Sequence, residues 1–146
     1  MIEPGSVPTR RHWFVDALIT AGWAPLAVLT VHVFAAKVLH LYRTHPRADI
    51  PMHIAGGAAI AFLYWRMATR ASAVDAIGRI NKWGMCLLVF GLVGTTTVFW
   101  EFAEFGSDLW FHTGAQSGLQ DTLGDMFFGI AGGVVFLIFA ALRKRA

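Results

Sequence analysis

The chain has 146 residues, of which 56% are hydrophobic and only 14% charged, and its mean hydropathy is +0.56. Soluble domains carry about 25% charged residues, so this composition excludes an ordinary soluble protein and predicts an integral membrane protein. The length predicts a single membrane domain covering residues 1–146 and excludes a separate soluble catalytic domain. The single Cys86, in an apolar run, excludes a thiolate metal site and is expected to be a small packing residue.

Four apolar segments approach the length of about 20 residues that a helix needs to cross a bilayer. The first contains Pro25, which predicts a kinked helix. The second is the least apolar, and Tyr64 and Trp65 predict that its end lies at the membrane interface. We therefore expect an all-α polytopic membrane protein, a four-transmembrane-helix bundle, with spans at about 16–37, 52–70, 83–104 and 122–142.

Glycines in three of these spans predict places where two helices approach closely, because small residues let helix backbones meet in a membrane. The glycines in question are Gly56, Gly57, Gly91, Gly94, Gly129, Gly132 and Gly133.

The basic residues predict the orientation of the bundle. Four spans place both termini on one side of the membrane, and that side receives nine of the 12 lysines and arginines. Because basic segments stay in the cytoplasm, both termini are expected there. The basic balance also fits membrane lipids as partners, whereas no reader motif predicts nucleic-acid binding. The nine are Arg10, Arg11, Arg66, Arg70, Arg79, Lys82, Arg143, Lys144 and Arg145, and the other three are Lys37, Arg43 and Arg47.

Three pairs of titratable side chains fall at the outer end of this predicted bundle. They lie in DIPMH at the start of the second span, in WEFAE at the end of the third, and in DTLGD at the start of the fourth. Spacings of three and four residues place both members of a pair on one helix face. Pro51 predicts that the first acid of DIPMH lies in the approach loop just before the helix. The six residues are Asp49, His53, Glu101, Glu104, Asp121 and Asp125.

Ionised carboxylates near lipid cost several kcal/mol unless they are compensated, and three interpretations remain open. The acids and the imidazole could share a divalent metal ion of unknown identity, as paired ligands from facing helices do in di-metal carboxylate proteins. They could instead share protons or bind an organic cation. They could also be structural, capping helices and facing interfacial water, or be neutralised by Arg43 and Arg47.

Two further histidines are candidate additional ligands. His32 lies in the outer half of the first span. His112 follows the aromatic run Leu109–Phe111, which we expect to lie on the membrane surface as a lid over the centre.

The stretches DIPMH with GG close behind, WEFAE, and DTLGDMFFGIAGG resemble the YjdF-like family of small bacterial inner-membrane proteins and, more distantly, the VanZ-like proteins. The resemblance covers about residues 49–133. It implies a four- or five-helix bundle in the bacterial cytoplasmic (inner) membrane and gives no established reaction. VanZ-like proteins are associated with glycopeptide-antibiotic tolerance at the cell envelope.

Two functional classes follow. One is a small envelope enzyme or lipid-modifying protein whose outward-facing centre uses a divalent metal ion. The other is a non-catalytic subunit, in a homo-oligomer or a larger membrane complex, whose acids are structural or handle protons. The sequence has no Ser/His or Cys/His nucleophile arrangement, so whether the protein is an enzyme stays open.

Overall fold

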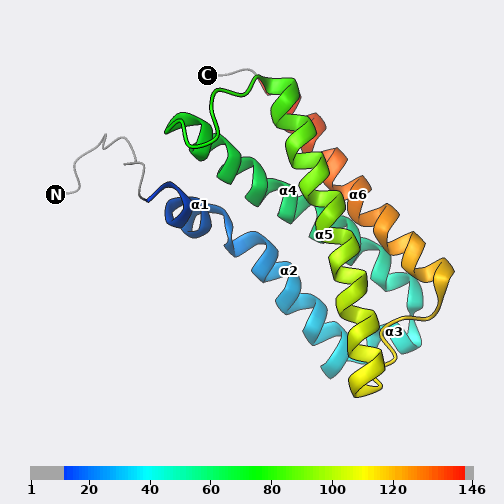
Figure 1. The fold of residues 1–146 in the computed structure, drawn as a ribbon. Coiled ribbons are helices and arrows are strands. Elements are labelled where there is room, and N and C mark those ends of the chain that lie inside the picture. Colours follow the sequence, from blue (N-terminus) through cyan, green and yellow to red (C-terminus); the bar gives the residue numbers. More distant parts are fainter. Residues whose placement is uncertain (1–11, 144–146) are drawn as a thin grey trace.

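A computed structural model of the protein describes residues 12–143, apart from the side chains of Arg43 and Pro46. The described part is helical and contains no strand, which confirms the all-α class (Figure 1). Arg10, Arg11, Lys144 and Arg145, which entered the orientation argument, lie outside it. The elements are α1 (Trp13–Ala21), α2 (Trp23–Val33), the π-helix η1 (Phe34–Val38), α3 (Leu41–Thr44), the short 3₁₀ helix η2 (Pro46–Ala48), α4 (Asp49–Ala73), α5 (Lys82–Phe111) and α6 (Leu119–Leu142).

Helix α4 is the centre of the bundle, because it packs against α1, α2, α5 and α6, most extensively against α6. Glycines allow the backbones of α4 and α6 to approach each other closely. A Cβ atom on Gly57 would overlap the backbone carbonyl of Gly129, and one on Gly132 would overlap the carbonyl of Ile54. The expected glycine contacts are thus confirmed at the α4–α6 interface. They are wrong for Gly91 and Gly94, where an added Cβ would meet nothing within 4 Å.

The buried core is small, and much of the apolar surface faces outward. Ala61, Val89, Val93 and Leu137 form the core, with Cys86 packed against it as expected. Large side chains elsewhere point away from the bundle: Phe99, Phe127 and Phe139 are 65%, 66% and 69% exposed. So much exposed apolar surface is typical of a protein that faces lipid.

The expected count of four spans is not confirmed. Among the described residues, α5 and α6 are long and apolar enough to cross a membrane, and α1 with α2 and η1 adds a third span if this bent pair is counted as one. Helix α4 has 25 residues but falls short in hydropathy, because charged and polar side chains near both of its ends leave an apolar stretch of only residues 54–63. The membrane-protein class therefore holds with two or three candidate spans.

The first segment bends just before its proline. The bend between α1 and α2 is 45° and lies at Gly22. Pro25 is the third residue of α2, where its missing N–H needs no partner within the helix. The predicted kink is confirmed, but the break comes three residues before the proline.

Two predicted helix ends are wrong. Helix α4 begins at Asp49, so this residue lies in the first helical turn and not in a loop. Pro51 fits as the third residue of this helix, because the first N–H groups of a helix have no partner within the helix. Helix α5 continues to Phe111, so the aromatic run Leu109–Phe111 is its exposed last turn and not a surface lid. Nothing in the run breaks a helix, and α5 ends only at His112, which takes a left-handed conformation.

We predict that Gly132→Ala destabilises the protein by about 1–3 kcal/mol, because the added methyl group overlaps the backbone of α4 and forces two helices apart. Thermal unfolding of the detergent-purified protein measures this. Gly91→Ala is the matched control: it has open space and should be neutral or stabilising, since alanine is favoured over glycine in a helix by about 0.5–1 kcal/mol. Equal melting temperatures for the two variants would contradict the close α4–α6 contact.

Candidate functional site

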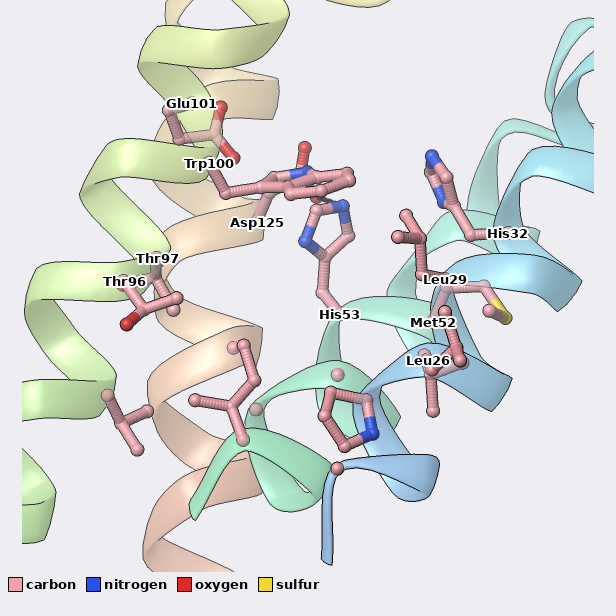
Figure 2. A pocket seen from close by; sticks show the side chains of 18 residues that line it. Leu26, Leu29, His32, Met52, His53, Thr96, Thr97, Trp100, Glu101 and Asp125 are labelled. Carbon is pink, nitrogen blue, oxygen red and sulfur yellow. Dashed lines mark ion pairs between the residues drawn. The ribbon is translucent and has the colours of Figure 1, made fainter. Parts of the chain in front are cut away.

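A cavity of about 380 Å³ lies between α2, α4, α5 and α6. Figure 2 shows that its charged and aromatic side chains gather at one end, whereas Leu26, Met52 and Thr96 lie away from that end. The polar end lies where the N-terminal parts of α4 and α6 meet the segment of α5 around Glu101. The cavity therefore joins an apolar chamber to a charged cluster.

His53 lies at the centre of that cluster. Its Nε2 atom is 3.3 Å from Oδ2 of Asp49, one turn earlier on α4, and 3.4 Å from Oδ1 of Asp125 on α6. The His53 side chain is only 10% exposed. Nevertheless, neither Nε2 of His53 nor the buried Oδ1 atom of Asp49 makes a hydrogen bond. Buried polar atoms are nearly always satisfied, so the unpaired Oδ1 atom of Asp49 and the long contacts of His53 leave room for a further partner.

Asp125 connects this group to the acids of α5. Ligand atoms of Asp49, His53 and Asp125 all lie within 4.8 Å of one another, and the same holds for Glu101, Glu104 and Asp125. Donor atoms bonded to one ion at about 2.0–2.2 Å are at most about 4.4 Å apart. Small side-chain movements would therefore let either group surround a cation.

The charge of the cluster is strongly negative. Asp49, Glu101, Glu104 and Asp125 face one histidine, and among the side chains that the structure describes no lysine or arginine pairs with them. Arg47 is thus not a counter-ion, and the Arg43 side chain lies outside the described part. Carboxylate oxygens suit Mg²⁺ and Mn²⁺, and imidazole nitrogen suits Fe²⁺ and Zn²⁺, so this mixed set of donors fits a divalent ion.

Aromatic side chains cover the cluster on the α2 side. The His32 ring meets the Trp100 ring edge-on, with centroids 5.5 Å apart, and its Nδ1 atom is 3.2 Å from the hydroxyl of Tyr42. Burial, together with the negative charges of Asp49 and Glu104, raises the pKa of Tyr42 to about 12, so its hydroxyl stays protonated. The structure places His32 in the cavity wall but in neither ligand group.

Asp121 and His112, both expected at the centre, belong to neither ligand group. The Asp121 carboxylate accepts a hydrogen bond of 3.1 Å from the backbone N–H of Ser117 in the loop before α6. His112 is exposed at the end of α5. The sequence thus grouped six residues, of which the structure brings five together.

Three residues of the site were not found from the sequence. Trp100 donates from Nε1 to Oε1 of Glu104 at 2.8 Å, and Gln116 donates from Nε2 to the Glu101 carbonyl at 3.1 Å. Tyr42 reaches the site from α3. Of these three, only Trp100 could have been predicted from the sequence, because its spacing of four residues from Glu104 places the two side chains on one helix face.

The loop of residues 112–118 is held by a carboxylate at the end of α5. Asp108 accepts hydrogen bonds from the N–H groups of Ala115 at 2.7 Å and Gln116 at 2.9 Å, and from the hydroxyl of Thr113. This arrangement positions Gln116 against Glu101. Asp108 is therefore a structural acid of the loop and belongs to neither ligand group.

Comparison with known proteins gives a family but no activity. A family model described as "Predicted membrane protein (DUF2238)" matches residues 4–146. No curated protein and no solved structure matches the chain. The match is consistent with the YjdF-like resemblance, and it does not show the more distant VanZ-like relation. With its helical fold, its lipid-type surface and a match over nearly its whole length, the chain belongs to the DUF2238 family of membrane proteins.

Proposed function

We propose that this protein binds a divalent metal ion in its carboxylate/His centre and uses the ion to act on a lipid or another substrate of the cell envelope. The observation that supports the proposal is the pair of ligand groups joined by Asp125, with Nε2 of His53 and Oδ1 of Asp49 buried and without hydrogen bonds. A cation would satisfy both orphan atoms and neutralise the acids. Bound there, it would act as a Lewis acid on a phosphoryl or carbonyl oxygen.

One observation favours a second candidate. The two contacts of His53, at 3.3 and 3.4 Å, have the length of ion pairs. A protonated His53 shared between Asp49 and Asp125 would make the cluster a structural or proton-handling element of a non-catalytic subunit. Metal content separates the two candidates.

The proposal includes a topology. We place the protein in the bacterial cytoplasmic membrane with four spans, both termini in the cytoplasm and the centre at the outer face. Helix α4 is the span that hydropathy misses. Its 25 residues extend about 37 Å, enough for a hydrocarbon core of about 30 Å, and its contacts with four other helices shield its polar positions from lipid.

We predict that the purified protein contains a stoichiometric divalent metal and that Asp125→Asn removes it. Loss of residues that only orient a ligand costs about 10- to 100-fold in metal affinity, so loss of the shared ligand should cost at least as much. Elemental analysis after gel filtration measures the metal. Asp121→Asn, one turn earlier on α6, is the matched control and should keep the ion, because that carboxylate is engaged with Ser117. A metal-free wild type would overturn the proposal in favour of the proton-sharing candidate.

We predict that Glu101→Gln and Asp125→Asn are coupled across α5 and α6. If both residues serve one ion, either change disables the site, and the double variant should cost less than the sum of the single changes by about 0.5–3 kcal/mol. Unfolding of the four proteins of this cycle, with and without added metal, measures the coupling. Costs that add to within about 0.5 kcal/mol would mean that the two acids act independently.

The topology is tested with reporters that are active only outside the cytoplasm. A reporter inserted at Thr113, in the loop beside the centre, should be active, and one fused after Ala146 should be silent. The reverse pattern would place the centre in the cytoplasm and would exclude an outward-facing envelope function.

A further inference from the structure

The chamber beyond the charged cluster has an apolar wall. Leu26 and Leu29 of α2 line it on one side, and Thr96 and Thr97 of α5 line it on the other. The two threonine hydroxyls donate hydrogen bonds to carbonyls of their own helix, at 2.9 and 2.8 Å. They offer no unsatisfied donor to an occupant. The chamber therefore favours a hydrocarbon ligand over a polar one.

The wall of the chamber at α2 includes residues that are also exposed at the surface of the protein. Leu26 and Leu29 line it and are also 62% and 41% exposed. Helices α2 and α5 meet through the rings of His32 and Trp100, and the chamber extends from this contact toward the bend at Gly22. In a bilayer, exposed leucines of a membrane helix face lipid chains. A lipid chain can thus reach the chamber sideways from the membrane.

The volume of the cavity and the charges at its polar end indicate which class of ligand it can bind. A volume of about 380 Å³ lies within the range of about 300–1,000 Å³ that is typical of small-molecule sites. The four carboxylates would repel an anionic headgroup in the absence of a cation. Once a divalent ion is bound, an anionic oxygen becomes a favourable ligand.

We infer that the cavity binds the hydrocarbon chain of a membrane lipid and presents the lipid's phosphate headgroup to the metal ion held near His53 and Asp125. This inference rests on the proposed function, because the phosphate contact needs the metal. It specifies the substrate class of the centre as a lipid phosphate that enters from the bilayer. The chain-binding chamber itself does not depend on the metal.

Photo-crosslinking tests the inference. The full-length protein is reconstituted into vesicles of a phosphate-free lipid, digalactosyl diacylglycerol, that contain a trace of a long-chain alkyl phosphate with a diazirine in the middle of the chain. Mass spectrometry then locates the labelled residues. We expect labelling to concentrate on Leu26, Leu29 and the facing turn of α5. Labelling spread evenly over lipid-facing residues such as Phe127 would overturn the inference.

A cavity-filling variant gives a matched comparison. A Cβ atom on Gly56 would meet only Val28 Cγ1, at 4.0 Å, so Gly56→Leu can fold while placing its side chain in the chamber. The added leucine would overlap the bound lipid chain, and such overpacking costs about 1–3 kcal/mol. Binding of the chain, and therefore labelling inside the cavity, should fall at least about fivefold. Gly91→Leu, on the open face of α5, should label like the wild type. Equal labelling of both variants would contradict chain binding in the cavity.

The contact between the phosphate headgroup and the metal ion is tested on the same samples. Removing metal with EDTA should lower labelling by the alkyl phosphate and leave labelling by the matched alkyl alcohol unchanged. Metal bound without cavity labelling would sink the inference while the proposed function stands. Cavity labelling in a protein without metal would leave the chamber as a lipid site, and would overturn both the phosphate contact and the proposed metal function.

Discussion

The gathering of four carboxylates, two of them buried and two half-buried, beside a single imidazole is the constraint on which this structure depends. Three helices from distant parts of the sequence bring their acids to one place, and the described part of the protein supplies no lysine or arginine to pair with them. Such a cluster opposes folding unless a cation or protons neutralise it. The close glycine contacts of α4 and α6 then acquire a clear role, because they hold Asp49 and Asp125 near each other against this repulsion.

The sequence predicts the composition of the cluster better than its geometry. Spacings of three and four residues correctly placed Glu101 with Glu104 and Asp49 with His53, because helical periodicity alone determines such pairs. The same spacing places Asp121 near Asp125 on α6, but a backbone N–H in the preceding loop engages the Asp121 carboxylate, which belongs to neither ligand group. Loop conformation is a tertiary property, and the residues that form this loop carry no periodic signal.

Hydropathy found α5 and α6, the two most apolar helices. It misplaced the end of α5, and it did not predict the central position of α4. Helix α5 runs seven residues past the predicted end at 104, because aromatic residues continue a helix as readily as they sit at an interface. Helix α4 is central in the bundle although its hydropathy is low. A polar helix can occupy that position because its neighbours cover it, and window averages along one segment contain no information about neighbours.

The order of the elements along the chain has a consequence for biosynthesis. Asp125, which belongs to both ligand groups, is carried by the last helix of the described part. During synthesis, Glu101 and Glu104 therefore enter the membrane region before their partner on α6 exists. Until α6 is in place, these acids lack the partner that connects them to α4. Insertion of α6 is thus the step that completes both ligand groups.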